Sequence, residues 1–297
     1  MQIVRTPASA RAIARTLKRP VGLVPTMGAL HDGHFALALR AKAENPSVVA
    51  SLFVNPLQFG PQEDFGRYPR DFERDVEPLA ALGVELLYAP DVSRMYPPGF
   101  ASSIDVGARG ARFEGASRPG HFGGVATVVA KLLHAIEPTS LYLGQKDVQQ
   151  TVVIRTLVRD LDFATNVVVV PTVREPDGLA LSTRNVFLAA AERRGAPSLH
   201  VALQTVANAV SAGETDAARA CAAGAALLQA PLRWEYLAVV DPQSFEPCDP
   251  ILRPAIVIGV VRAGTTRLLD NELIASPEGV LPVLTPRRTP AWSGHMR

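Results

Sequence analysis

The 297-residue chain has few cysteines, little net charge and no long apolar run. Its two cysteines, Cys221 and Cys248, are too few for a disulfide framework or a cysteine-based metal cluster, and they indicate a reducing, cytoplasmic compartment. The formal charge is only +2, without a block of like charges, so it favours neither a nucleic-acid nor a membrane partner. No apolar stretch reaches the roughly 18 residues of a membrane span. The first twenty residues lack the apolar core of a secretory signal.

Instead, short apolar β-rich runs alternate with helical patterns in the first part of the chain. This alternation predicts a parallel sheet covered by helices on both faces, which binds ligands at the carboxyl ends of its strands. Strands are predicted at 21–24, 47–55, 84–90, 141–144 and 167–171, and helices at 33–43, 71–82, 123–136 and 147–159.

The sequence pattern changes after about residue 174. Residues 189–229 are Ala-rich and helical, with a break near Ala212-Gly213, and the segments 234–241, 255–264 and 265–274 are typical of strands. We therefore predict an α/β protein with three parts. They are a Rossmann-like parallel-sheet domain over 1–174, a smaller C-terminal α+β domain over 175–285, and a disordered tail over 286–297.

Two histidines follow the first predicted strand, in VPTMGALHDGH (24–34). His31 and His34 lie where a helix begins, and the unpaired N–H groups of a helix N-terminus favour phosphate. Their imidazoles could donate hydrogen bonds to a polyphosphate, while Gly28 and Gly33 would let the backbone approach it closely. Neither GxxxxGK[ST] nor GxGxxG occurs. The alternatives are solvated turn histidines or half of a metal site, although no third ligand accompanies them.

A second polar segment, GLALSTRN (178–185), follows the last strand of the first domain. The permanently charged guanidinium of Arg184 suits phosphate oxygens, and Ser182 and Thr183 add two hydroxyl groups. The alternative is that one of these hydroxyls caps a helix entering the second domain.

A third segment, LYLGQKDVQQ (141–150), joins a strand to a helix. Lys146 could contact phosphates, Asp147 could hold Mg²⁺ or a ribose hydroxyl, and Gln150 would lie near both on one helical face. A capped helix with solvated polar residues is the alternative.

The fourth segment, FVNPLQFG (53–60), lies at the end of the second predicted strand. The amide of Gln58 offers donors and acceptors to a small polar substrate, and Asn55 would brace the loop. A simple turn at Asn55-Pro56 is the alternative. However, all four segments follow strands of one parallel sheet, so they share one edge, which independent turns and caps would not require.

With these motifs, the chain resembles the pantothenate synthetase family of pantoate–β-alanine ligases, within the wider HxGH nucleotidyltransferases. The resemblance covers about residues 1–285 and rests on motifs in the family's order. These are PTMGALHDGH, FVNPLQFG, RYPRDFERD, RPGHFGGVATVV, YLGQKDVQQ, VREPDGLALSTRN and the later VVD.

The resemblance implies a two-step reaction. Pantoate attacks the α-phosphate of ATP to give pantoyl adenylate and pyrophosphate, and β-alanine then displaces AMP to give pantothenate. It also implies Mg²⁺ with ATP, a homodimer, and a C-terminal domain that closes over the site.

The family's functional positions map onto this chain motif by motif. His34, His31, Lys146 and Arg184 are the implied catalytic residues, with His34 at the family's proton-donor position. Pantoate and β-alanine would contact Gln58, Gln150 and Asn55. The ATP site is implied at Met27, Gly28, Ala29, Leu30, His31, Asp32, Gly33, His34, Gly144, Gln145, Lys146, Asp147, Val173, Leu181, Ser182, Thr183 and Arg184.

Two positions depart from the family pattern. Gln145 stands where Glu is common, and Thr183 where Ser is common. Two other functions compete with the ligase. One is an HxGH enzyme that only transfers AMP to a phosphorylated acceptor. Such an acceptor would call for cationic residues, whereas Gln58 and Gln150 are neutral amides. The other is a non-catalytic nucleotide-binding protein, which should have lost at least one of the four candidate catalytic residues.

Overall fold

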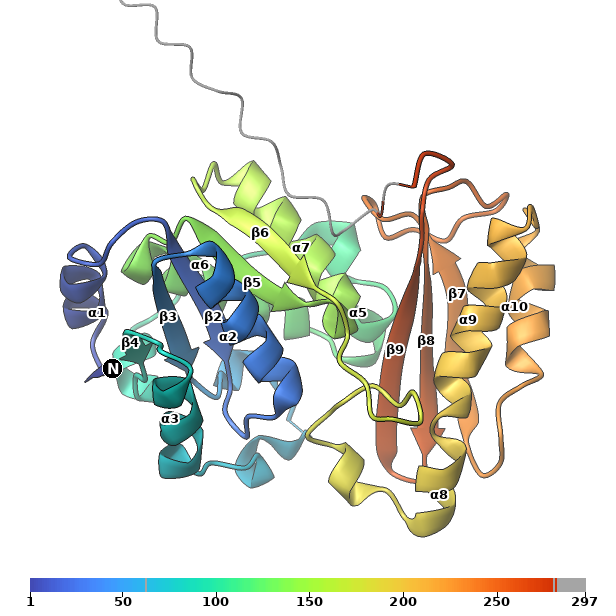
Figure 1. The fold of residues 1–297 in the computed structure, drawn as a ribbon, viewed down its shortest axis with the longest axis horizontal. Coiled ribbons are helices and arrows are strands. Elements are labelled where there is room, and N and C mark those ends of the chain that lie inside the picture. Colours follow the sequence, from blue (N-terminus) through green and yellow to red (C-terminus); the bar gives the residue numbers. More distant parts are fainter. Residues whose placement is uncertain (62, 280, 282–297) are drawn as a thin grey trace, which may run out of the picture.

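The computed structural model describes residues 1–61, 63–279 and 281. Figure 1 shows two sheets side by side, each with its own helices. The first sheet is six-stranded and wholly parallel, in the order β1-β4-β3-β2-β5-β6. Its strands are β1 (Gln2–Val4), β2 (Val21–Thr26), β3 (Ser47–Leu52), β4 (Leu86–Tyr88), β5 (Ser140–Gly144) and β6 (Asn166–Val170).

Helices cover both faces of this sheet. Apolar residues of α1, α6 and α7 pack in one buried cluster with one face of the strands, and residues of α2 and α3 pack in another with the opposite face. Strand β2 illustrates the pattern, since Leu23 belongs to the first cluster and its neighbour Val24 to the second. The helices of this part are α1 (Pro7–Ala14), α2 (Asp32–Glu44), α3 (Phe72–Ala81), α4 (Val92–Met95), α5 (Glu114–Ser117), α6 (His121–Ile136) and α7 (Val148–Asp160).

The second sheet is three-stranded and antiparallel, in the order β7-β8-β9. Its strands are β7 (Arg233–Val240), β8 (Ala255–Ala263) and β9 (Thr266–Ile274), and its helices are α8 (Ala190–Gly195), α9 (Ser198–Ser211) and α10 (Ala217–Ala225). In Figure 1, α9 and α10 cover the outer face of this sheet, and β9 is the edge strand nearest the first domain.

Strand β8 is buried on both faces. Val257 and Val261 pack with α9 and α10, whereas Ile256 and Ile258 belong to the same apolar cluster as the first domain's helix α6. The hydrophobic core is therefore continuous across the contact between the two domains, which explains why residues 255–261 read as an unbroken apolar run.

The structure confirms the predicted fold class and corrects some boundaries. The strand predicted over 47–55 ends at Leu52, because the chain turns there toward a 3₁₀ turn, η1 (Pro56–Gln58). Strand β1 and helices α1, α4 and α5 lay outside the predicted elements. The tail predicted over 286–297 lies outside the described residues. Within the part of the chain that the structure describes, no helix is long and apolar enough to cross a membrane.

Candidate active site

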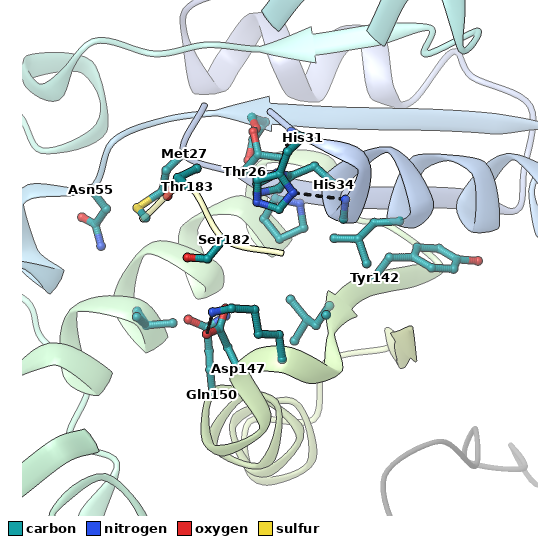
Figure 2. Close-up of a pocket in the computed structure, with 18 of the residues that line it drawn as sticks. Thr26, Met27, His31, His34, Asn55, Tyr142, Asp147, Gln150, Ser182 and Thr183 are labelled. Carbon is teal, nitrogen blue, oxygen red and sulfur yellow. Dashed lines mark hydrogen bonds and ion pairs between the residues drawn. The ribbon is translucent and has the colours of Figure 1, made fainter. Parts of the chain in front are cut away.

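A cavity of about 240 Å³ opens at the carboxyl ends of the parallel strands. The four polar segments follow β2, β3, β5 and β6, which are neighbours in the sheet. The connections from β2 to α2 and from β5 to α7 leave from either side of the point where the strand order reverses, the place where open α/β sheets bind ligands. Figure 2 shows His31 and His34 on one side of the cavity, and Asp147 and Gln150 opposite them.

Both imidazoles are oriented by backbone amides. His31 precedes α2, and its Nδ1 accepts a hydrogen bond from Gly33 N over 3.1 Å, while Nδ1 of His34 accepts one from His31 N over 3.3 Å. An Nδ1 that accepts cannot carry the proton of a neutral ring, so Nε2 carries it in both residues. The rings lie 4.2 Å apart between centroids and both line the cavity. The site thus holds two neutral N–H donors side by side.

Burial keeps both histidines uncharged. It lowers the pKa of His31, with a further contribution from the charge of Lys146. The pKa of His34 is lowered to about 3, first by burial and then by neighbouring His31. At neutral pH these residues therefore donate hydrogen bonds, and a bound polyphosphate would raise both pKa values by adding negative charge.

The backbone before these histidines is held by a buried carboxylate. Asp75 on α3 is 2% exposed, and its two oxygens accept from Ala29 N (2.9 Å) and Leu30 N (2.8 Å). Gly28 has φ +93°, and a Cβ there would lie 2.8 Å from an Asp75 oxygen. Only glycine meets both requirements, so Gly28 and Asp75 together set the shape of the turn.

The segment after β5 brings a cation and a carboxylate to the opposite wall. Lys146 and Asp147 lie in the 3₁₀ turn η4 (Gln145–Asp147), with Lys146 Nζ 3.6 Å from Asp147 Oδ1. Desolvation within the site would raise the pKa of Asp147, whose side chain is about half exposed, but the charges of Lys146 and Arg184 outweigh it, and the pKa is lowered. This wall therefore carries an ionised carboxylate beside Lys146, and Arg184 adds a second positive charge from the segment after β6.

The segment after β6 doubles back on itself. Residues Arg174 and Ala180 form an antiparallel bridge, and Leu181 N donates to Val173 O over 3.0 Å, which returns Ser182 to the cavity. The Ser182 hydroxyl accepts from Arg184 N over 3.2 Å, so it organises its own turn and caps no helix of the second domain.

Gln58 projects into the cavity from a braced turn. Asn55 Nδ2 donates to Gln58 Oε1 and to Gly124 O, each over 3.1 Å, and Gln58 Nε2 lies 3.0 Å from Met27 Sδ. A Cβ on Gly124 would lie 2.2 Å from Leu57 O, so this glycine permits the close packing of η1 on α6.

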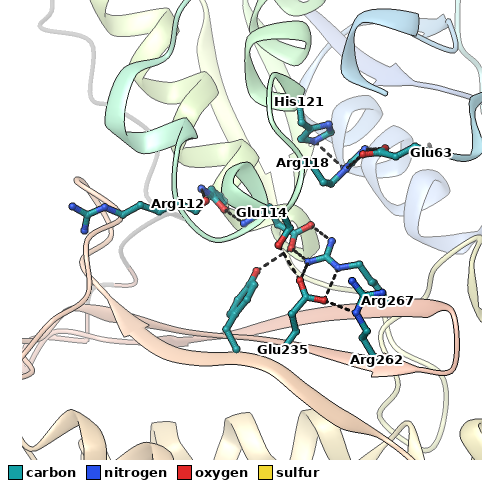
Figure 3. A network of polar contacts seen from close by, with 11 residues as sticks. Glu63, Arg112, Glu114, Arg118, His121, Glu235, Arg262 and Arg267 are labelled. Atoms are coloured by element: carbon teal, nitrogen blue, oxygen red, sulfur yellow. Dashed lines mark hydrogen bonds and ion pairs between the residues drawn. The ribbon is translucent and has the colours of Figure 1, made fainter. Parts of the chain in front are cut away.

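Polar groups behind Gln58 hold its backbone. Figure 3 shows Arg118 and His121 beside Glu63. His121 Nδ1 lies 2.8 Å from Gln58 O, and Arg118 donates to both carboxylate oxygens of Glu63 and to Gln58 O. Burial and the charge of Arg118 lower the pKa of His121 to about 4, so it is neutral and donates to the Gln58 carbonyl.

A separate ion-pair cluster joins the two domains. In Figure 3, Arg267 of β9 lies between Glu114 of α5 and Glu235 of β7. Its guanidinium donates to Glu114 over 2.6 and 2.9 Å and to Glu235 over 2.8 and 3.0 Å. All three side chains are about one-fifth exposed or less, so water screens this cluster weakly.

Most of the predicted site residues line the cavity, and five do not. The residues that line it are Met27, His31, Gly33, His34, Asn55, Gln58, Gly144, Lys146, Asp147, Gln150, Val173, Leu181, Ser182, Thr183 and Arg184. Gly28, Ala29 and Leu30 face Asp75, and Asp32 is exposed at the start of α2. Gln145 is buried, and its side chain turns away from the cavity to Asn271 of β9.

The residues missed from the sequence are supporting ones. Asp75 lies in RYPRDFERD, and Arg118 and His121 lie in RPGHFGGVATVV, both of which carried the resemblance without an assigned role. Asn271 was missed altogether, because nothing in the sequence indicates that β9 packs against the turn after β5.

Comparisons with known proteins identify the family and agree with the fold. The family model described as pantoate-beta-alanine ligase matches residues 2–273. The chain is 50% identical to a pantothenate synthetase of Roseiflexus sp. (strain RS-1) over 273 residues, which is 91% of this chain and 98% of the relative.

Two solved structures are similar over nearly the whole chain. The pantothenate synthetase of Thermus thermophilus has a TM-score of 0.87 and 50% identity, covering 93% of this chain and 100% of that one. The pantoate-beta-alanine ligase of Francisella tularensis, complexed with beta-gamma ATP and beta-alanine, has a TM-score of 0.75 and 34% identity, covering 92% of this chain and 97% of that one.

Proposed function

Since the chain belongs to the pantoate–beta-alanine ligase family, we propose that the cavity at the carboxyl ends of β2, β3, β5 and β6 is its active site. The enzyme is an AMP-forming acid–amine ligase that condenses pantoate with β-alanine at the expense of ATP. The observation that carries the site assignment is the pairing of two neutral Nε2–H donors with Lys146 and Arg184 around one cavity.

The reaction has two steps. A carboxylate oxygen of pantoate attacks the α-phosphorus of ATP, and the bond to the bridging oxygen breaks to release pyrophosphate. The amine of β-alanine then attacks the acyl carbon of pantoyl adenylate. The amine loses a proton, the carbon–oxygen bond to AMP breaks, and pantothenate is formed.

The proposed catalytic residues stabilise the charge that develops on phosphate. As pyrophosphate leaves, negative charge grows on its oxygens. His31 and His34 would donate hydrogen bonds to those oxygens from one side, while Lys146 and Arg184 supply positive charge from others. Such preoriented donors commonly contribute about a hundredfold or more each to the rate. The low pKa of His34 supports a role as hydrogen-bond donor rather than imidazolium acid.

The proposed pantoate site lies between two glutamines. Gln58 and Gln150 both line the cavity, one on the turn after β3 and the other on α7. Asn55 fixes the Gln58 amide through Oε1, so that amide is preorganised for a hydroxyl or carboxylate. Gln58 also lines the adjoining space between the domains, which would bring β-alanine to the acyl carbon.

The donor set also fits Mg²⁺ bound as a complex with ATP. Asp147 is the carboxylate among the described residues that line the cavity, and its lowered pKa keeps it ionised. Mg²⁺ commonly takes one or two carboxylates together with substrate phosphates. Asp147 would hold the ion, and Mg²⁺ supplies neutralisation of the phosphate charge when bound.

We propose a division into residues 1–174 and 175–285, which is supported by a buried apolar cluster formed within 179–274. A homodimer, as the resemblance implies, would be tested by light scattering. A cytoplasmic location fits the two free cysteines, Cys221 and Cys248.

Exchange of labelled pyrophosphate into ATP tests the function. Purified protein with Mg²⁺ and pantoate, but no β-alanine, should catalyse exchange, and omission of pantoate should abolish it. Addition of β-alanine should then produce AMP and pantothenate in equal amounts. Exchange that does not need pantoate would favour a nucleotidyltransferase with another acceptor, and ATP binding without exchange would favour a non-catalytic protein.

A further inference from the structure

The second domain reaches into the proposed active site through one buried amide. Asn271 lies on β9, the edge strand nearest the first domain, and its side chain is 1% exposed. Its Nδ2 donates to the backbone carbonyls of Gln145 (2.9 Å) and Lys146 (3.0 Å). Both hydrogens of the amide are thus used on the turn that carries Lys146.

The orientation of this amide is fixed by a second amide. Gln145 Nε2 donates to Asn271 Oδ1 over 3.2 Å. If the Asn271 amide were reversed, its oxygen would face two carbonyl oxygens and its nitrogen would face the Gln145 nitrogen. The partners therefore allow only one orientation. A glutamate at 145 could not make this donation, so the pair needs glutamine here.

The turn has little other side-chain support. Gly144, which precedes η4, has no side chain to cap it, and Asp147, which precedes α7, makes no side-chain capping hydrogen bond in the described structure. The adjacent residue of β9, Asp270, accepts from Arg174 in the segment after β6. Neighbouring residues of one strand thus hold two of the segments that form the cavity.

We propose that Asn271 is a positioning residue for the first half-reaction, which acts by fixing the backbone of Lys146, with Gln145 as the residue that orients it. This inference rests on the proposed function, because Lys146 has to contact phosphate for its position to matter. A shift of about 1 Å in a catalytic group can cost about a hundredfold in rate. The C-terminal domain would then place a cation of the ATP site in addition to covering the site.

The test is pantoate-dependent exchange of pyrophosphate in Asn271→Asp, Lys146→Ala and the double variant. Aspartate keeps the volume of asparagine but cannot donate to the two carbonyls. We expect Asn271→Asp to slow exchange about tenfold or more with little change in KM for pantoate. The double variant should be no slower than Lys146→Ala alone. A purely structural role for Asn271 would make the two losses multiply.

One control variant and one second test variant accompany Asn271→Asp. Ser117→Ala removes a 2.9 Å hydrogen bond to Glu235 between the same two domains, away from the Lys146 turn, and should leave exchange unchanged. Gln145→Met removes the orienting donor while keeping the length of the side chain, and it decides the question if Asn271→Asp does not fold. It should slow exchange severalfold, again with no further loss in the Lys146→Ala background.

The inference would be overturned if Asn271→Asp and Gln145→Met both keep the exchange rate within about twofold of the parent. It would also be overturned if their losses multiply with that of Lys146→Ala. If the parent itself shows no pantoate-dependent exchange, the proposed function fails, and calorimetry of ATP binding decides the role of Asn271. Asn271→Asp should then weaken ATP binding in the parent, but it should cause no further weakening in the Lys146→Ala background. Unchanged affinity or additive losses would reject it.

Discussion

The ring of His34 accepts a hydrogen bond at Nδ1 from the backbone amide of His31, over 3.3 Å. This contact decides which nitrogen of the His34 ring carries the proton, and it makes the backbone of His31 a support for His34. A pair of histidines three residues apart therefore works here as one unit of two Nε2–H donors.

His34→Ala should slow pantoate-dependent pyrophosphate exchange by about a hundredfold or more, because a preoriented donor to the leaving phosphate is lost. His134→Ala is the matched control, since His134 is exposed on α6 and its ring lies beside that of Phe163, away from the cavity. Unchanged exchange in His34→Ala would remove His34 from the catalytic residues.

Burial of neutral His34 should make the fold acid-sensitive. Its pKa is about 3 in the folded chain and about 6.5 when unfolded, so between these values only the unfolded chain binds the proton. The free energy of unfolding is therefore highest above about pH 6.5 and falls as the pH drops. The contribution of His34 to this fall is about 1.4 kcal/mol at pH 5.5. Urea unfolding at pH 7.5 and 5.5 measures this loss.

His34→Gln is the comparison for that measurement. The variant should lose less stability than the parent between the two pH values, although His121 still contributes in the same direction. Equal losses in the parent and the variant would show that His34 is not a buried neutral group.

Asp75→Asn should raise KM for ATP about tenfold. The amide keeps one acceptor for the turn but points an N–H₂ group at the other backbone amide, so the turn before His31 shifts. Asp71→Ala on the same helix is the control, because it removes an N-cap and costs about 1 kcal/mol of stability without touching the turn. A rise in KM that is the same in both variants would indicate a general effect of helix α3.

Asp147→Asn should increase the Mg²⁺ concentration needed for half-maximal exchange. The substitution removes the carboxylate that lines the cavity and is expected to hold the ion beside the phosphates. Titration of Mg²⁺ at saturating ATP measures the shift. An unchanged midpoint with a lower maximal rate would assign Asp147 a contact with ATP itself.

Arg267→Met should destabilise the protein by about 3 kcal/mol, because the largely buried Glu114 loses its ion-pair partner and Glu235 keeps only Arg262. Urea unfolding measures the loss. The triple variant that adds Glu114→Gln and Glu235→Gln should recover part of it, whereas no recovery would point to lost packing of the arginine stem.

The sequence predicted the fold well where packing is local and periodic. Apolar runs such as 167–171 and the helical pattern of 123–136 decide their own secondary structure, and the order of strands and helices predicts the parallel sheet. The short helices α4 and α5 were missed because four residues carry no period.

The candidate site divides in the same way. Residues in the turn or first helical turn that follows a strand, such as Lys146 and His34, could be placed from sequence because the strand sets where that turn begins. Asp75 and Asn271 could not, since each acts across a long sequence separation on backbone groups, and backbone hydrogen bonds leave no pattern in the sequence.

The shared core has a consequence for synthesis of the chain. Ile256 and Ile258 of β8 belong to an apolar cluster whose other buried members come from the parallel-sheet domain, from the end of β7 and from Phe245. A nascent chain that has emerged only as far as Val240 holds every strand of that domain. However, it still lacks Ile256 and Ile258, which cover one apolar face. Exposed faces of this kind bind chaperones or aggregate. The first domain therefore depends on β8, which is synthesised after all six of its own strands, so a chain truncated before β8 would lose the packing of both domains together.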